Sequence, residues 1–313
     1  MMVSCVDTAM KSIEPIVTVF HSPEATRSSV ERETVKKLGA IGRSLSERPI
    51  PGVRVEAPPA ASRTDLELVH SPAYVEAVLT GEPEDLAQSS GVGRWDEGLA
   101  RSVLHTTGAV IEACERAMMT GRPCCALAAG LHHAKFASGD GFCTVNGLVI
   151  GARRALAMGK SRVLIIDLDA HCGGGTASLI ADIPGVEQVD VSVIPYDTYP
   201  SSAKSRLEVL AGIEKGDEYL EVLRRALASV NYPEEIDLVI YNAGVDVTGM
   251  AGGIRAVDAG VVRARDRQVF EWTKAHGIPM AWVLAGGYTV DCTMDELVDL
   301  HRIAMEEAVS TWS

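Results

Sequence analysis

Residues capable of acid–base or metal chemistry follow four apolar segments of strand length in this sequence. These residues are His132, His133, Asp167, Asp169, His171, Asp246 and Tyr288. They lie within a few positions of glycines. In open α/β sheets, ligands bind beyond the carboxyl ends of the strands, where such side chains meet. Neighbouring glycines let the backbone approach a ligand closely. The sequence therefore predicts one functional site at the carboxyl edge of a sheet.

The spacing of Asp169 and His171 suits a metal site. On an extended segment, residues two apart point to the same face, and a carboxylate beside an imidazole suits a divalent transition metal. Asp246, at the end of another predicted strand, would complete a set of two aspartates and one histidine. Three protein ligands with an open position are typical of catalytic zinc, and Fe²⁺ also accepts such a site. The alternative is that Asp169 caps the next segment and His171 is an ordinary buried histidine.

Strand-length apolar runs alternate with longer segments of helical periodicity. The predicted strands are 16–20, 124–129, 163–169, 188–193, 237–243 and 280–285, and the predicted helices are 24–45, 97–119, 146–158, 217–229, 258–276 and 294–309. This alternation predicts an α/β fold with a central, mostly parallel sheet and helices on both faces. Proline-rich 48–59 and Gly/Ser-rich 89–93 are expected to be surface loops. Because strands occur on both sides of these loops, we expect 1–313 to form a single catalytic domain.

Composition and charge exclude several classes of protein. The 313 residues are 47% hydrophobic and 23% charged, which excludes a disordered or low-complexity chain. With a net charge of −13, the chain lacks the excess of basic residues that is typical of nucleic-acid-binding proteins. No stretch approaches the roughly 20 apolar residues that span a bilayer. Asp7, Lys11 and Glu14 interrupt any secretory signal, and the seven cysteines show no paired spacing. We therefore expect a cytoplasmic protein with neither nucleic-acid nor membrane partners.

The same residues resemble the histone deacetylase superfamily, the deacetylase branch of the arginase-like fold. The matching motifs are His-His-Ala…Gly-Phe-Cys at 132–143, Asp-Leu-Asp-Ala-His at 167–171, Ala-Gly-Val-Asp at 243–246 and Gly-Gly-Tyr at 286–288. The segments 265–270 and 277–279 are similar to compact bacterial and class IV-like members, and the resemblance extends over about 16–310. It implies a zinc-dependent amidohydrolase that removes an acetyl or other acyl group from an amine, such as acetyl-lysine or an acetylpolyamine.

The resemblance also implies roles for the site residues. The zinc ligands would be Asp169, His171 and Asp246. The tandem histidines His132 and His133 would handle protons, with His133 as the general base and then the general acid. Asp167 would orient His132, and Tyr288 would donate a hydrogen bond to the scissile carbonyl.

Two further sets of residues follow from the resemblance. The acyl-lysine tunnel would be formed by Gly141, Phe142 and Tyr199, with the two aromatic rings as its walls. A structural K⁺ near the zinc would be bound by Asp167, Asp169, His171, Ser192 and Val193, partly through backbone carbonyls.

The sequence departs from the family pattern at two positions near the predicted metal ligands. Gly174 stands where the family has an aspartate or asparagine that contacts the second tandem histidine. His133 is therefore expected to lack that partner, which could lower its pKa or leave its tautomer less fixed. Cys172 stands where a second histidine is common, and its side chain is expected to point away from that of His171.

Three other functions remain open at this point. A deacylase of a specialised small metabolite would use the same residues, and a metal-binding pseudoenzyme is favoured by the missing side chain at Gly174. A dimanganese ureohydrolase shares the fold but needs a carboxylate two residues after the metal histidine, where this chain has Gly173. The sequence predicts neither the acyl chain length nor the oligomeric state.

Overall fold

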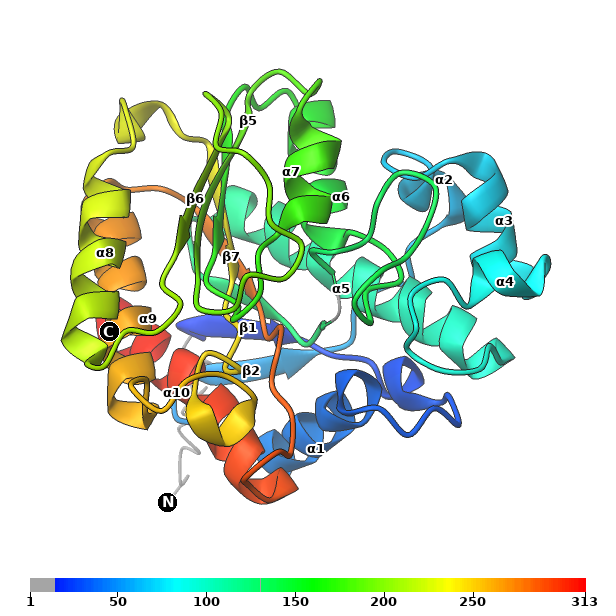
Figure 1. The fold of residues 1–313 in the computed structure, drawn as a ribbon, viewed down its shortest axis with the longest axis horizontal. Coiled ribbons are helices and arrows are strands. Elements are labelled where there is room, and N and C mark those ends of the chain that lie inside the picture. The colour runs from blue at the N-terminus through cyan, green and yellow to red at the C-terminus, as the bar shows by residue number, and fades with distance from the viewer. Residues whose placement is uncertain (1–14, 130) are drawn as a thin grey trace, which may run out of the picture.

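The computed structural model describes residues 15–129 and 131–313, which contain one eight-stranded sheet with helices on both faces (Figure 1). Its strands are β1 (Val17–Phe20), β2 (Val53–Glu56), β3 (Cys124–Ala126), β4 (Val163–Asp167), β5 (Val186–Ser192), β6 (Ser205–Val209), β7 (Leu238–Asn242) and β8 (Met280–Val283). They follow the order β2-β1-β3-β8-β7-β4-β5-β6, and every neighbouring pair is parallel. The predicted parallel α/β architecture is confirmed. Asp7, Lys11 and Glu14, which argue against a secretory signal, lie outside the described residues.

The helices lie in two layers, one on each face of the sheet. The longer ones are α1 (Glu33–Glu47), α3 (Pro72–Thr80), α5 (Glu97–Thr120), α6 (Gly147–Ala157), α8 (Gly216–Ala228), α9 (Ala259–Ala275) and α10 (Met294–Trp312). The shorter ones are α2 (Arg63–Leu66), α4 (Glu84–Ala87) and α7 (Gly174–Ile180), with 3₁₀ turns at Pro23–Thr26, Pro233–Glu235 and Gly249–Ala251. Within the described residues, no helix is long and apolar enough to cross a membrane.

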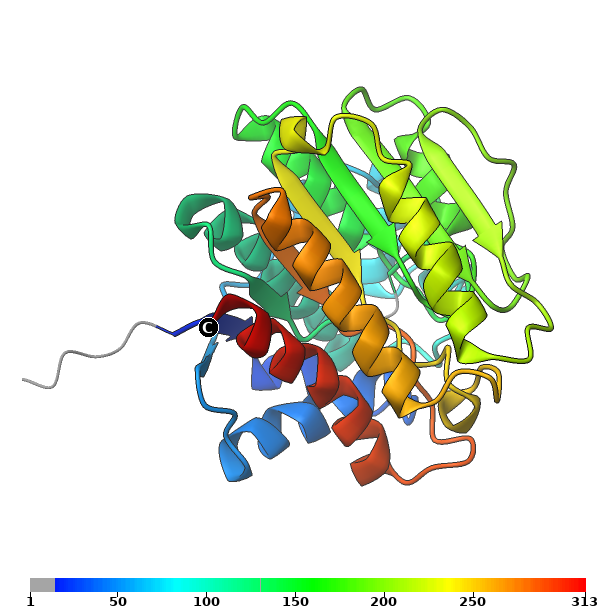
Figure 2. The same ribbon diagram turned by 90° about the vertical axis from the view of Figure 1, so that its left-hand side faces the viewer.

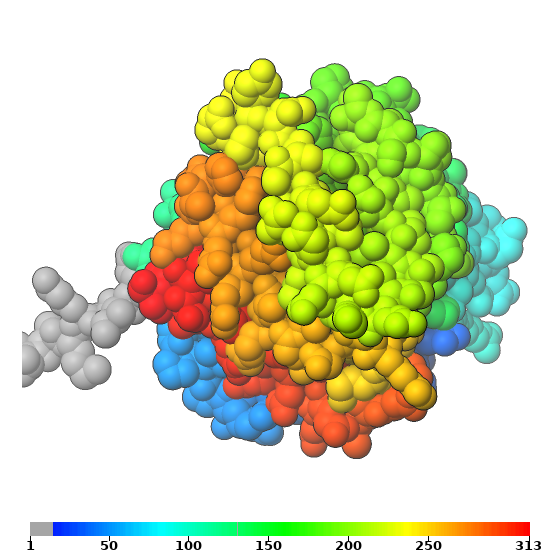
Figure 3. Space-filling model, turned by 60° about the vertical axis from the view of Figure 1, so that its left-hand side comes forward, coloured from blue at the N-terminus to red at the C-terminus, as the bar shows by residue number. Residues whose placement is uncertain are grey.

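The central strands are apolar along their length because both of their faces are covered. In β4, Leu164 and Ile166 pack in the cluster formed with α1, α8, α9 and α10, whereas Val163 and Ile165 pack in the cluster formed with α3, α5 and α6. Figure 2 shows the first group of helices lying across the sheet, and in the space-filling view of Figure 3 their side chains form a closed surface.

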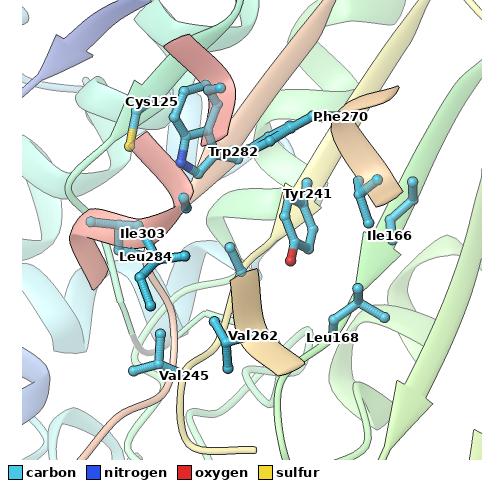
Figure 4. Close-up of a cluster of buried hydrophobic side chains, with 14 of the residues drawn as sticks. Cys125, Ile166, Leu168, Tyr241, Val245, Val262, Phe270, Trp282, Leu284 and Ile303 are labelled. Atoms are coloured by element: carbon cyan, nitrogen blue, oxygen red, sulfur yellow. The ribbon is translucent and has the colours of Figure 1, made fainter. Parts of the chain in front are cut away.

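Aromatic side chains fill the core beneath α9 and α10 (Figure 4). The ring of Phe270 meets those of Trp282 and Tyr241 edge to face, with centroids 5.3 Å and 6.0 Å apart. Each such pair adds about 0.5–1.5 kcal/mol beyond the burial of its area. This packing fixes β7 and β8, the two central strands that lead to Asp246 and Tyr288.

The structure differs from the sequence prediction at both edges of the sheet. β2 lies within 48–59, which its prolines predict to be a loop; these prolines flank the strand rather than interrupt it, and an edge position tolerates them. β6, at the opposite edge, is largely exposed and therefore lacks the apolar run of a central strand. The predicted helix 24–45 is also interrupted, because a 3₁₀ turn occupies 23–26 and α1 begins only at Glu33.

Candidate metal centre and active site

Four adjacent strands, β3, β8, β7 and β4, bring the predicted ligand and catalytic residues to one edge of the sheet. Ligand atoms of Asp169, His171 and Asp246 all lie within 4.8 Å of one another. His171 Nδ1 is 3.1 Å from Asp169 Oδ1 and 3.3 Å from Asp246 Oδ2. The structure therefore brings together the three residues predicted to bind metal, although they come from two separate loops.

The surroundings of these three side chains fit a divalent cation. Asp169 and Asp246 are 2% and 0% exposed, and Asp246 Oδ2 has no hydrogen-bond partner among the described residues. Burial and the charge of Asp169 raise the pKa of Asp246, since two carboxylates lie side by side away from water. Gly286 leaves them room, because a Cβ there would overlap with both carboxylates. Zinc or Fe²⁺ is suitably bound by two buried carboxylates beside an imidazole. The unpartnered oxygen of Asp246 is a free donor atom for such an ion.

Arg265 holds together the two loops that carry the carboxylates. No pattern in the sequence predicts this role. This side chain is fully buried, and its Nη1 donates to the carbonyl oxygens of Leu168, at 3.1 Å, and Gly244, at 2.5 Å. Its Nε donates to Asp266 Oδ1 at 2.9 Å. One guanidinium therefore fixes the distance between the segments before the ligands.

Replacing Arg265 with lysine is expected to lower metal affinity about 10-fold, because outer contacts of a metal site typically contribute 10–100-fold. Lysine keeps a positive charge beside Asp266 but has no planar fork to bridge two carbonyls. Affinity would be measured by competition with a chromophoric chelator. The matched control is Arg267→Lys. Arg267 lies on α9 like Arg265, is half exposed, and forms an ion pair with Glu307 of α10. Equal affinity in both variants would exclude a bridging role for Arg265.

The first tandem histidine, His132, is paired with Asp167 as predicted. Its Nδ1 lies 2.9 Å from Asp167 Oδ2, and Asn242 Nδ2 donates to the other oxygen of that carboxylate at 2.8 Å. Burial disfavours the charged ring, but the carboxylates of Asp167 and Asp169 outweigh burial and raise the pKa of His132 to about 10.

The second tandem histidine, His133, has a partner that the sequence did not predict. Its Nδ1 lies 3.0 Å from Asp197 Oδ2, so the expectation that Gly174 leaves this ring without a carboxylate is wrong. Burial and the adjacent His132 lower the pKa of His133 below its usual 6.5, while the bond to Asp197 acts in the opposite direction. No local pattern identifies Asp197, because it lies on a different loop.

A cavity of about 630 Å³ opens over His133, His171 and Tyr288. Phe142 and Tyr288 stand on its walls with ring centroids 6.4 Å apart. Gly141 also lines it, with φ +50°, and a Cβ there would overlap with the imidazole of His133. Two of the three predicted substrate-binding residues, Gly141 and Phe142, are therefore at the cavity.

Tyr199, predicted as the second aromatic wall, does not line this cavity. Its hydroxyl lies 3.1 Å from Asp190 Oδ2, away from the opening. Tyr196 takes the wall position instead, with its ring centroid 4.9 Å from that of His133 and its hydroxyl donating to Asp140 at 2.7 Å. Tyr196 and Tyr199 are only three positions apart. Which of them lines the cavity depends on the path of the loop, and the sequence does not show that path.

The five residues predicted to bind potassium lie on two neighbouring segments. Val193 N–H donates to the carbonyl of Ala170 at 2.9 Å, and Ser192 Oγ donates to the carbonyl of His171 at 3.2 Å. Asp190, which was not predicted, is fully buried beside them, and burial and the charge of Asp167 raise its pKa to about 8. Binding of potassium stays a prediction.

A second, small cavity of about 20 Å³ lies behind the metal ligands and contains Lys37 in its lining. Lys37 is 1% exposed, its Nζ lies 3.3 Å from the carbonyl of Gly287, and burial lowers its pKa to about 8. Because a lysine in an amphipathic helix is normally exposed, no sequence pattern predicts that Lys37 is buried at the site. Cys172 is buried against the carbonyl of Ile194 and lines neither cavity.

Comparison with known proteins finds relatives over most of the chain. The family model for the histone deacetylase domain matches residues 31–302. An uncharacterized protein of Picosynechococcus sp. is 35% identical over 268 residues, which cover 84% of this chain and 87% of that protein. Histone deacetylase 2 of Arabidopsis thaliana is 30% identical, covering 74% of this chain and 62% of that protein.

Two further similarities are more distant. The acetoin utilization protein AcuC of Bacillus subtilis is 27% identical, covering 61% of this chain and 55% of that protein. The crystal structure of the HDA15 HD domain superposes with a TM-score of 0.76 at 20% identity, covering 94% of this chain and 90% of that one. The second similarity shows that the fold is shared.

Proposed function

The chain belongs to the histone deacetylase family, and we propose that it is a zinc-dependent deacetylase that removes an acetyl or other acyl group from an amine. The observation that carries this proposal is the shared cavity: His171 of the ligand set, His133 and Tyr288 all face it. We propose further that the sheet and its helices act as one catalytic domain.

The proposed mechanism assigns proton transfer to His133. When bound, zinc would supply Lewis-acid chemistry, polarising an acyl carbonyl and lowering the pKa of water. The bond from His133 Nδ1 to Asp197 leaves Nε2 as the acceptor that takes a proton from water and returns it to the leaving amine. Because burial lowers the pKa of this ring below 6.5, His133 is unprotonated at neutral pH and able to accept.

Tyr288 is proposed to stabilise the negative charge that develops on the carbonyl oxygen. Burial and the charges of Asp246 and Asp169 raise the pKa of its hydroxyl above the usual 10, so the group stays protonated and donates a hydrogen bond. Its main-chain N–H donates to the carbonyl of Ala251 at 3.0 Å, which fixes the loop that carries it. The ring is thereby held on the wall of the cavity.

Tyr288→Phe is expected to lower kcat by about 10²–10³, the usual effect of losing one donor to an oxyanion. Zinc content and thermal stability should stay unchanged, because the hydroxyl contributes to neither the ligand set nor the core. Steady-state kinetics with metal analysis of the same sample would test this expectation. An unchanged kcat would remove Tyr288 from the mechanism.

The candidate substrates are amides of extended amines, such as acetyl-lysine or an acetylpolyamine. The acidic rim residue Asp140 is already engaged by Lys135 at 2.9 Å and by the hydroxyl of Tyr196. The guanidinium of Arg32 lies 4.3 Å from the ring centroid of Phe142, a residue on the cavity wall. The carboxylate of Asp140 is therefore already paired and is not a free charge for a cationic amine.

The deciding experiment is acetate release by zinc-loaded protein from an acetyl-lysine peptide, free acetyl-lysine, acetylputrescine and acetylspermidine. Each reaction would be run with and without chelator. We expect chelator-sensitive release from at least one of these amides. Absence of release from all four, with zinc bound at one equivalent, would contradict the deacetylase proposal and favour another acyl group or a pseudoenzyme.

A further inference from the structure

The carboxylate of Asp197 stands where a side chain at position 174 would stand. A Cβ added to Gly174 would overlap with both the carboxylate and the main-chain oxygen of Asp197. Asp197 Oδ2 accepts the N–H of Gly175 at 3.0 Å and lies 3.0 Å from His133 Nδ1. Asp197 therefore places its carboxylate at the beginning of α7, although it lies 22 residues after Gly175 in the sequence.

The loop after β5 is shaped to hold Asp197 in this place. Asp197 has φ +56°, a left-handed conformation that aspartate and asparagine tolerate better than most residues. The main-chain oxygen of the preceding residue, Tyr196, accepts the N–H of Cys172 at 3.0 Å. The side chain of Asp197 is 11% exposed, and its Oδ1 lies 3.6 Å from Lys135 Nζ. The carboxylate is thus fixed by contacts on both of its oxygens.

We propose that Asp197 is the positioning residue for His133, and that glycine at 174 is required because Asp197 fills its side-chain space. This inference rests on the proposed deacetylase function, in which His133 moves the proton. A carboxylate that accepts from Nδ1 fixes the tautomer and keeps Nε2 free toward the cavity. Positions 174 and 197 therefore depend on each other.

Asp197→Gly is the first test, because glycine adopts φ +56° without strain and removes only the carboxylate. Its kcat is expected to fall about 10–100-fold, as for partners that orient the residues of a metal site, while KM and zinc content stay unchanged. Asp197→Asn keeps the left-handed preference and an acceptor oxygen, so its kcat should lie between those of Asp197→Gly and the wild type. A kcat for Asp197→Gly within about twofold of the wild type, well below that 10–100-fold range, would overturn the proposal.

The second test moves the carboxylate to the other loop. Gly174→Asp alone should be defective, because two side chains compete for one space. Gly174→Asp combined with Asp197→Gly removes the competing carboxylate, and glycine at 197 frees the main chain to turn its oxygen away from the added Cβ, so this variant should recover most of the kcat lost in Asp197→Gly. A fully active Gly174→Asp single variant, or a folded double variant no better than Asp197→Gly, would contradict the dependence between the two positions.

A third measurement needs no substrate and separates this inference from the proposed function. In ¹⁵N-histidine-labelled protein, NMR should show His133 protonated on Nδ1 in the wild type and redistributed between the two nitrogens in Asp197→Gly. If this change occurs but no amide is hydrolysed, the deacetylase proposal fails and the positioning role stands. If both proteins show the same tautomer, the positioning role fails whatever the activity.

Discussion

Asp246→Ala is expected to remove the bound metal and amide hydrolysis together. The substitution deletes one of three ligands and leaves a single buried carboxylate, Asp169, beside His171. The substitution also removes Asp246 Oδ1, which accepts a hydrogen bond from the N–H of Ala170 at 3.0 Å. The loop that carries the two other ligands therefore loses an anchor as well as a partner in binding.

Metal content after gel filtration in zinc-containing buffer is the measurement that tests this expectation. Asp169→Ala should behave in the same way, and Asp182→Ala, which changes an exposed aspartate, should keep both metal and activity. Asp246→Asn preserves the shape of the side chain and removes its charge, so it distinguishes loss of a ligand from loss of packing. Stoichiometric zinc in both Asp246→Ala and Asp169→Ala would refute the ligand assignment.

The three candidate ligands could be identified from the sequence because their signals are local. Asp169 and His171 stand two residues apart in the segment that follows a buried parallel strand, β4. Asp246 follows another apolar strand, and the topology of parallel sheets brings such strand ends to one edge. Periodicity and strand length contain this information, so the central strands and the long helices were predicted for the same reason.

The rest of the site depends on contacts between loops, which leave no periodic signal. Asp197 reaches His133 only because the chain after β5 turns through a left-handed residue and Gly174 leaves space. The choice of Tyr196 over Tyr199 at the cavity follows from the same turn. Lys37 is buried although helical periodicity predicts an exposed lysine, because carbonyls from the loop after β8 accept its ammonium.

His133→Ala is expected to lower kcat by about 10²–10⁴ while leaving zinc in place, the usual effect of removing a general acid–base group. His133 is not in the ligand set, and it is the tandem histidine that faces the open cavity. His132 is enclosed by Asp167 and Asp169, whose charges raise its pKa. The centroids of the two rings lie 3.9 Å apart, yet of the two only His133 lines that cavity.

The pH dependence of the wild type supplies an independent check on the same assignment. A base must be unprotonated to act, so kcat/KM should fall as the pH drops through the pKa of His133, which lies below 6.5 because of burial and the charge of His132. Asp197→Gly removes an interaction that raises this pKa, so the acid limb should shift to lower pH. If His133→Ala keeps activity within about tenfold of the wild type, below the 10²–10⁴ expected of an acid–base group, another group transfers the proton. Asp197 would then orient a ring that takes no part in the chemistry.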